Sequence, residues 1–316
     1  MKRETTAHFY YVKLQNKKII RNLLRGEAPQ SIAALAEKSG LSYPTVSNLL
    51  KELTAQGEAL VNNMPESCGG RPGIRYELNP FYQSALILCF EREQLLGQLW
   101  DYNGAFVAQK NLAIRPDTSV DEIIAFLKEI KADYPSLSVI SIGIPGVSLE
   151  QEIVFLPIFP KLVGKDLALR ITEEIEACVF LENDLNAIAL AESDARDNFS
   201  HIAYIDGCVG VGIVHNGEII KGCNGFAGEL EYLNPSAKDP QETLVQYILA
   251  LVCVLNQPEI LISGSECSTA LLKQVHEKLS QILPQERIPR LTLVSDIQTS
   301  YIQGLKKRIL MMWQEE

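Results

Sequence analysis

Between residues 31 and 53, apolar positions recur at helical spacing on either side of a glycine. Two sets of apolar residues would each bury one face of a helix: Ile32, Leu35 and Ala36, then Val46, Leu49, Leu50 and Leu53. Gly40 predicts the turn between these helices. Pro44 suits the first turn of the second helix, where the N–H that proline lacks has no intrahelical partner. Residues 31–53 therefore predict a helix-turn-helix.

The opposite face of the second predicted helix carries short hydrogen-bonding side chains and a cation. A helix that packs on one side and offers such groups on the other suits the major groove of DNA. We expect DNA contacts from Ser42, Tyr43, Thr45, Ser47, Asn48 and Lys51. For each residue the alternative stays open that it faces only water or a phosphate.

The flanking segments complete a winged helix-turn-helix over residues 1–80. Residues 17–24 predict a first helix, and residues 58–61 and 75–78 predict two strands joined by a glycine- and proline-rich loop. In that loop, Gly69-Gly70-Arg71-Pro72-Gly73 places an arginine on thin, extended backbone. The narrow minor groove of A/T-rich DNA attracts arginine, so we expect Arg71 to bind there. The alternative is a surface turn with an incidental arginine.

From residue 84 onward, apolar runs typical of strands alternate with helical patterns. The expected strands are 84–89, 95–100, one after Gly104, 139–144, 178–181, 202–205, 210–215 and 218–221; the expected helices are 121–131, 167–177 and one from 182–186 to about 192. This alternation indicates α/β layers, and ligands of such folds bind at the carboxyl ends of the strands.

The distribution of charge also divides the chain near residue 80. Residues 1–80 hold 11 Lys and Arg against 7 Asp and Glu, a net +4, and the rest holds 18 against 32, a net −14. Only the N-terminal segment suits a polyanion. The 316 residues suggest two or three domains, without a secretory or membrane segment. Seven scattered cysteines without C-x₂-C spacing argue against zinc and for the cytosol; those in apolar runs, such as Cys253, are expected in the core.

Four segments of the body resemble the ROK family, which groups bacterial sugar kinases with sugar-responsive repressors. They are residues 142–147 (IGIPGV), 181–187 (LENDLNA), 210–217 (GVGIVHNG) and 222–229 (GCNGFAGE). The Gly-Gly-Arg-Pro of the wing is similar to that of the family's repressors. The resemblance implies an α/β fold with a two-lobed actin-like (RNase H-like) body. We expect domains at 1–80, 81–190 (completed by a C-terminal helix at 300–316) and 191–299.

The sequence departs from the family's kinases at the phosphate loop. The resemblance places that loop on residues 89–93, where Glu91 and Glu93 replace the glycines and threonine that approach ATP. Two carboxylates would repel a triphosphate, and glycine-poor backbone cannot surround it with N–H groups. The family's zinc-binding histidine is Tyr232 here, and no cysteine cluster follows. We therefore expect no catalysis, no nucleotide cofactor and no metal.

The sugar side of the family's site is partly retained. By resemblance, Asn183 and Asp184 bind sugar hydroxyls, Glu229 also holds the sugar, and Gly146 lies in an adjoining loop. Carboxylates and amides suit this task because each can engage two neighbouring hydroxyls. Hydrophobic Ile158 and Leu162 replace polar or aromatic contacts. The alternative is that Asn183 and Asp184 only cap a helix.

The leading hypothesis is a cytoplasmic, sequence-specific DNA-binding regulator, a repressor of carbohydrate-related genes, whose body senses a sugar or sugar derivative. Its expected partners are double-stranded DNA, the sugar, and further copies of the chain in a homodimer or homotetramer. A sugar kinase with an added head, and a body that only dimerises, are the alternatives. The effector, the operator and the direction of regulation are not given by the sequence.

Overall fold

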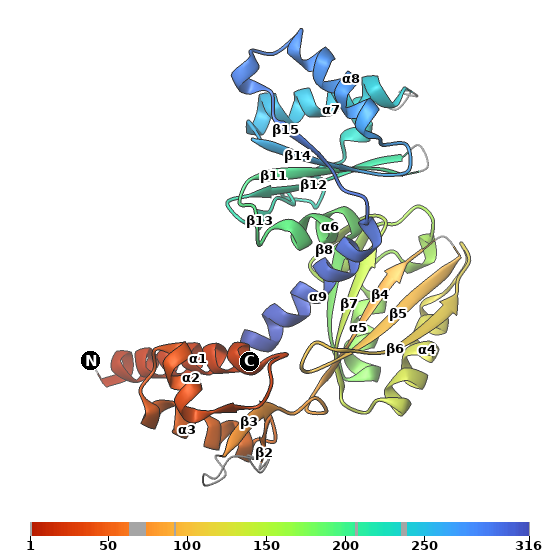
Figure 1. Cartoon of the computed structure of the whole chain (residues 1–316). Coiled ribbons are helices and arrows are strands. Elements are labelled where there is room, and N and C mark those ends of the chain that lie inside the picture. The colour runs from red at the N-terminus through yellow and green to blue at the C-terminus, as the bar shows by residue number, and fades with distance from the viewer. Residues whose placement is uncertain (1, 63–73, 92, 206–207, 235–238, 316) are drawn as a thin grey trace.

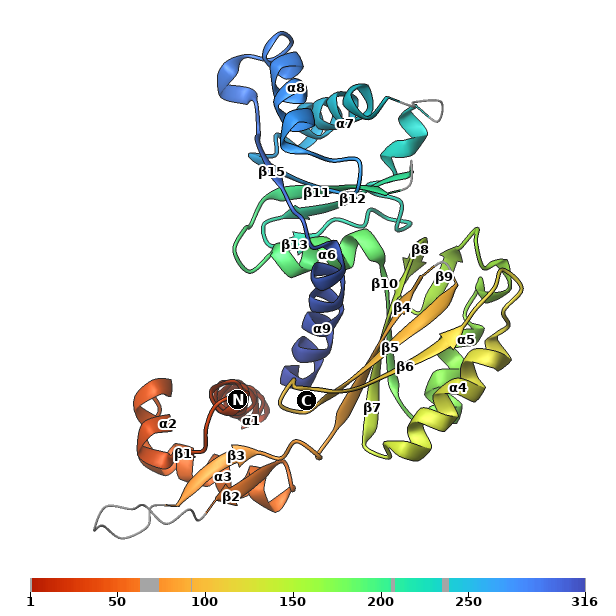
Figure 2. The same ribbon diagram turned by 45° about the vertical axis from the view of Figure 1, so that its right-hand side comes forward.

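The computed structural model describes residues 2–62, 74–91, 93–205, 208–234 and 239–315, which form a head and two lobes (Figure 1). The head lies beside one end of the first lobe, and the second lobe lies at the other end of the molecule (Figure 2). None of the helices in these ranges is long and apolar enough to span a membrane.

The head is a winged helix-turn-helix. Its elements are α1 (Lys2–Leu24), β1 (Gln30–Ser31), α2 (Ile32–Ser39), α3 (Tyr43–Ala55), β2 (Ala59–Asn62) and β3 (Arg75–Leu78), with strand order β1-β3-β2. The predicted turn is present: Gly40 has a φ of 70°, which favours glycine, and ends α2. Ser42 begins α3 by accepting a hydrogen bond from the Thr45 N–H.

Helix α1 begins 15 residues earlier than the apolar pattern predicted, at Lys2 instead of Lys17. Polar contacts hold part of this extension. Lys13 and Lys17 both bind Glu52 of α3, at 2.7 and 2.6 Å. Because these contacts link α1 to a helix 30 or more residues away in the chain, the local hydrophobic pattern did not reveal them.

The first lobe contains a five-stranded sheet of order β10-β7-β4-β5-β6. Its strands are β4 (Ser84–Phe90), β5 (Gln94–Asp101), β6 (Phe106–Ala113), β7 (Leu137–Ile144) and β10 (Cys178–Asn183). One face packs on α4 (Val120–Asp133), α5 (Asp166–Arg170) and the π-helical turn η2 (Ile171–Ile175). A hairpin of β8 (Val147–Leu149) and β9 (Glu152–Phe155), followed by η1 (Pro160–Leu162), extends from the end of β7.

The second lobe repeats the strand pattern of the first. Its sheet has the order β13-β12-β11-β14-β15, formed by β11 (Phe199–Ile205), β12 (Cys208–His215), β13 (Glu218–Ile219), β14 (Glu259–Ser263) and β15 (Arg290–Leu293). In both sheets an antiparallel three-stranded unit is extended by two parallel strands. Two such lobes confirm the expected actin-like body. The lobe's other elements are η3 (Leu230–Leu233), α7 (Pro240–Leu255), α8 (Thr269–Ser280) and η4 (Gln285–Arg287).

Two helices connect these parts. Helix α6 (Asp184–Glu192) follows the last strand of the first lobe and leads into the second lobe, and α9 (Ile297–Glu315) runs back from the second lobe to the head (Figures 1 and 2). Helix α9 packs against α6, β4, β7 and α1. Its buried residues recur every four positions: Tyr301, Leu305, Ile309 and Trp313. They join the core of the head and the inner face of the first sheet into one hydrophobic cluster.

Two further sequence predictions were wrong in detail. The single helix expected over 167–177 is α5 followed by η2, and it ends at Glu176 with a φ of 55°. The Thr172 hydroxyl donates to the Ala168 carbonyl at 3.0 Å, a contact that competes with regular helical bonding. Cys253, expected in the core, is exposed on α7 next to Val254, because a helix that is apolar on every side cannot bury all its residues against one neighbour.

We predict that Gly304→Ala destabilises the protein. At most exposed helical positions this change is favourable by about 1 kcal/mol, but a β-carbon at Gly304 would lie 1.7 Å from the Ala187 carbonyl oxygen. Helices α6 and α9 must separate to admit it, at a cost of about 1–3 kcal/mol. Urea unfolding measures the change, with exposed Gln303→Ala as the control. Equal or greater stability of Gly304→Ala would contradict the close packing.

Candidate functional site

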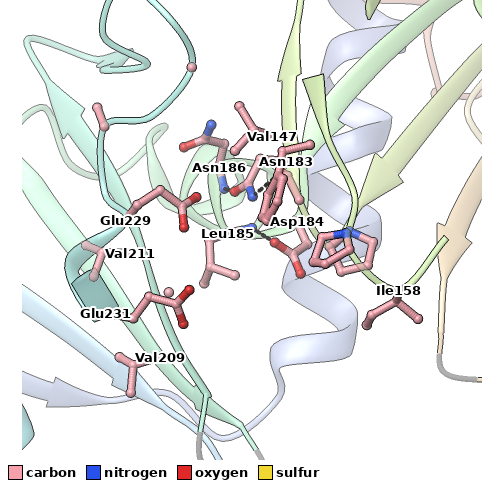
Figure 3. A pocket seen from close by; sticks show the side chains of 17 residues that line it. Val147, Ile158, Asn183, Asp184, Leu185, Asn186, Val209, Val211, Glu229 and Glu231 are labelled. Atoms are coloured by element: carbon pink, nitrogen blue, oxygen red, sulfur yellow. Dashed lines mark hydrogen bonds between the residues drawn. The ribbon is translucent and has the colours of Figure 1, made fainter. Parts of the chain in front are cut away.

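A pocket of about 340 Å³ lies between the two lobes (Figure 3). One side comes from the first lobe: the loop after β7, the β8–β9 hairpin and the start of α6. The other side comes from β12 and from the segment that leads to η3 in the second lobe. The structure brings together in this pocket the residues predicted to bind a ligand: Gly146, Asn183, Asp184 and Glu229.

The Asn183 side chain has a structural role within the pocket wall. Its Oδ1 accepts a hydrogen bond from the Asn186 N–H at 3.0 Å and so caps α6. Its Nδ2 donates to the Gly146 carbonyl at 2.8 Å. These contacts of Asn183 fit the alternative interpretation, in which it caps a helix. The same contacts fix the Gly146 loop against α6 and thus set the shape of the pocket.

Asp184 is differently placed. One carboxylate oxygen accepts a hydrogen bond from the Leu185 N–H at 2.8 Å, and the side chain faces the pocket (Figure 3). Burial raises the pKa of Asp184 to about 7, the backbone hydrogen bond opposes this rise, and the negative charge of Glu229 adds to it. A carboxyl group with such a pKa holds a proton readily, so it can donate as well as accept a hydrogen bond.

Two further carboxylates face Asp184 from the second lobe. Glu229 precedes η3, and Glu231 lies within it (Figure 3). The pKa of Glu229 is raised, first by burial and then by the charge of Glu231. Sequence reasoning missed Glu231 as a pocket residue. Its position two residues after Glu229 was the available signal. Glu231 was still missed, because the 3₁₀ turn that brings both side chains to one side was not predicted.

The glycines of the motif segments allow close backbone approach around the pocket. A β-carbon at Gly146 would lie 2.3 Å from the Phe155 carbonyl oxygen, and one at Gly212 would lie 2.3 Å from the Leu185 carbonyl oxygen. Gly228 has a φ of 97° and leaves no room for a side chain beside Val211. These glycines therefore bring β12, α6 and the Glu229 segment close enough together to form the site.

The chemical character of the pocket is acidic and partly apolar. Asp184, Glu229 and Glu231 line it, and the described lining residues include no Lys, Arg or His. Ile158 lies in the pocket wall as predicted, whereas Leu162 is buried in the core of the first lobe and does not line the pocket. Carboxylates and apolar side chains suit a ligand with many hydroxyl donors, and they disfavour an anion such as a sugar phosphate.

Glu91 and Glu93 lie away from this pocket. With Gln94, Asn111 and Ala113 they border a shallow depression at the β4–β5 turn. Glu91 accepts hydrogen bonds from Gln94 and, at 3.4 Å, from Gln298 of α9.

In the head, the polar face of α3 is open to solvent. Tyr43, Asn48 and Lys51 are exposed, and Ser47 is partly exposed. Ser42 and Thr45 are engaged in the helix cap, with their hydroxyl oxygens 2.8 Å apart. Arg71 lies outside the residues that the structure describes.

The raised pKa of Asp184 predicts a loss of stability with rising pH. The folded state keeps a proton on Asp184 up to about pH 7, whereas an unfolded Asp loses it near 3.8. The contribution of Asp184 to the free energy of unfolding should therefore fall between about pH 4 and 7, by at most about 1.4 kcal/mol per pH unit, while buried His201, whose pKa is lowered to about 4, acts in the opposite direction. The raised pKa of Glu229 changes stability in the same direction. Asp184→Asn should therefore remove only part of the dependence of stability on pH.

Urea unfolding of wild type and Asp184→Asn at pH 5, 6 and 7 measures this effect. The stability of wild type relative to Asp184→Asn should decrease at each step. Parallel curves for the two proteins would show that Asp184 titrates normally.

Comparison with solved structures supports the fold. A ROK family transcriptional regulator described as a homologue of the Escherichia coli MLC protein superposes with a TM-score of 0.70 and 19% identity, over 96% of this chain and 99% of the other. A putative N-acetylmannosamine kinase from Listeria monocytogenes superposes with a TM-score of 0.61 and 15% identity, over 73% and 100% of the two chains. At these identities the matches establish a shared fold.

Sequence comparison finds named relatives. The xylose repressor of Bacillus subtilis (strain 168) is 27% identical over 243 residues, covering 73% of this chain and 63% of the repressor. The DNA-binding transcriptional dual regulator NagC of Escherichia coli (strain K12) is 22% identical over 237 residues, covering 70% of this chain and 58% of NagC. The matches thus span less than two thirds of these relatives.

Family models match both parts of the chain. The winged helix-turn-helix DNA-binding model matches residues 15–57, which include α2 and α3. The ROK family model matches residues 93–241, which include the pocket segments from both lobes. Together with the fold and the pocket, these matches show that the chain combines an N-terminal winged helix-turn-helix with a ROK family domain.

Proposed function

We propose that the chain is a transcriptional repressor that binds operator DNA through its head and a sugar through the pocket between its lobes. The observation that carries the proposal is the pocket itself: Asp184 and Glu229 face each other from different lobes, in a chain that also presents an exposed polar helix to solvent. A ligand that contacts both carboxylates favours one separation of the lobes over others.

The proposed domains follow the boundaries predicted from the sequence. Residues 1–80 bind DNA, residues 81–190 form the first lobe, and residues 191–299 form the second. Helix α9 completes the first lobe, because its buried residues pack on the inner face of the first sheet. Two or four copies of the chain would present paired heads to a pseudo-palindromic operator.

In the head, the residues proposed to contact DNA form two groups. Tyr43, Ser47, Asn48 and Lys51 point away from the core of the head on α3 and are available to base edges and phosphates. Ser42 and Thr45 cap the helix, so their backbone and hydroxyl groups are better placed for a phosphate near the helix N-terminus. Arg71 is proposed for the minor groove from its sequence context alone.

The proposed effector is an unphosphorylated sugar. Three carboxylates without a cation among the described lining residues would repel a phosphate group, whereas sugar hydroxyls can donate to them. Xylose and N-acetylglucosamine are the first sugars to test, because relatives of this chain are named as repressors for them.

We further propose that the body does not transfer phosphate. Glu91 and Glu93 stand where the resemblance to sugar kinases requires a phosphate loop, and both face a shallow depression outside the pocket. The competing function is an active sugar kinase, which is favoured by the retained Asp184. The other competing function is a body that only dimerises, and it requires that no sugar binds the pocket.

We predict that Asn48→Ala weakens binding to operator DNA. Loss of a side chain that reads a base costs about 1–3 kcal/mol, or roughly 5- to 150-fold in affinity. Fluorescence anisotropy with an operator selected from random DNA measures the change. Exposed Asn22→Ala on α1 is the matched control and should leave the affinity unchanged. If the two variants behave alike, Asn48 does not recognise DNA.

We predict that Asp184→Ala removes the effect of the sugar on DNA binding. A sugar hydroxyl left without its partner costs about 1–3 kcal/mol, so calorimetry should show much weaker sugar binding. DNA affinity without sugar should remain near that of wild type, because the pocket and the head are separate sites. Exposed Asp133→Ala of α4 serves as the control.

The same proteins and sugars decide between the competing functions. In a coupled assay with ATP, wild type should form no sugar phosphate. Turnover that Asp184→Asn abolishes would establish a kinase instead. If the protein binds none of the sugars tested, dimerisation would remain as the role of the body.

A further inference from the structure

One carboxylate outside the pocket contacts the start of α6, the second lobe and α9. Glu182 is the residue before Asn183, and its side chain is 2% exposed. It accepts hydrogen bonds from the Asn183 N–H at 3.2 Å and from the Asn186 amide at 3.4 Å, both at the start of α6. It also accepts one from Lys221 of the second lobe at 2.8 Å. The Arg308 Nε of α9 lies 3.8 Å away.

Through Lys221, the contact with Glu182 depends on the position of the second lobe. It lies just after β13, and its carbonyl accepts a hydrogen bond from the Ala227 N–H at 3.2 Å. The segment between them lines the pocket at Gly225 and leads to Glu229. Any opening of the lobes that moves this segment away from α6 must also stretch the Lys221–Glu182 ion pair.

Arg308 ties the same carboxylate to the head. Five residues beyond it on α9, buried Trp313 packs edge-on against Tyr102 of the β5–β6 turn, with ring centroids 5.1 Å apart. The guanidinium of Arg25, the residue after α1, lies over both rings, 4.9 Å from the Tyr102 centroid and 5.4 Å from that of Trp313. The Tyr102 hydroxyl donates to Glu58, at 2.8 Å, and Glu58 in turn binds Arg21 of α1.

We propose that Glu182 is a positioning residue that couples the lobes to the head by changing its cation partner. With the lobes together, Glu182 pairs with Lys221. When the lobes separate, the carboxylate remains buried, and a buried charge needs a partner, so it pairs with Arg308 instead. The shift of Arg308 moves α9 and therefore the Trp313 contact with Arg25. The sugar dependence of this step rests on the proposed function, but the coupling itself does not.

The first experiment needs no sugar. Hydrogen–deuterium exchange is measured on full-length wild type, Glu182→Gln, Lys221→Met and the double variant. Glu182→Gln removes the charge and keeps an oxygen that can accept from the Asn183 N–H. Lys128→Met is the control, because Lys128 forms a 2.6 Å pair with Glu174 on the first lobe, away from α9.

The proposal predicts severalfold faster amide exchange both in residues 220–229 and in the last turns of α9 for Glu182→Gln and Lys221→Met, and not for the control. The double variant should match Glu182→Gln, because both lack the charge that can pair with Lys221 or with Arg308. Faster exchange confined to residues 220–229 would overturn the coupling. If Lys221→Met does not fold because it strands a buried charge, Glu182→Gln and the double variant decide.

The second experiment measures DNA affinity with and without saturating D-xylose or N-acetylglucosamine. The fold-change caused by sugar should fall toward one in Glu182→Gln, and an undiminished fold-change would overturn the proposal. If wild type binds neither sugar, these two effectors are excluded, while the exchange experiment still decides the role of Glu182.

Discussion

Where α6 crosses α9, the backbone of Gly304 lies against the carbonyl of Ala187 so closely that no side chain fits between them. The same close approach recurs one turn earlier on α9, where a β-carbon at Gly143 would lie 2.2 Å from the Tyr301 hydroxyl. These contacts place α9 on the inner face of the first sheet. From there its apolar side chains reach the head, and one hydrophobic cluster runs from the helix-turn-helix to the lobe junction. Because the burial of each large side chain contributes about 1.5–3 kcal/mol, the head is held firmly to the body.

That continuity gives the pocket a physical connection to the head. Asp184 begins α6, α6 packs on α9, and Trp313 near the end of α9 lies beside Arg25, the residue after α1. Packed helices move as units and repack between discrete arrangements, so a change in lobe separation at the start of α6 can reach α1 without unfolding any element. A head joined to the body only by a flexible linker would not sense such a change.

The partly buried carboxylates of the pocket differ from the fully buried carboxylates among the described residues. Glu58 binds Arg21, Glu182 binds Lys221, and Glu259 binds both Arg196 and Arg290. Asp184 and Glu229 have no such cation among the described lining residues. Burial raises the pKa of each, and the charge of Glu229 adds to the rise at Asp184 as that of Glu231 does at Glu229. Carboxylates that lack a paired cation and have a raised pKa destabilise the folded protein, and they are typical of sites that bind a ligand.

The sequence by itself determined those features that depend on local pattern. The apolar spacing over residues 31–53, the Gly40 turn and Pro44 predicted the helix-turn-helix, because helix faces and turns are decided within a few residues. The ordered motif segments gave the two-lobed fold and four residues of the pocket. Tertiary structure alone decided the rest. Glu52 holds α1 at Lys13, ahead of its predicted start. The exposure of Cys253 depends on which face of α7 found a neighbour, and the place of Glu231 in the pocket depends on a 3₁₀ turn. Likewise, Glu182 acquired its partners only when residues 39 and 126 positions away in the chain packed around it, and no local pattern encodes such distant contacts.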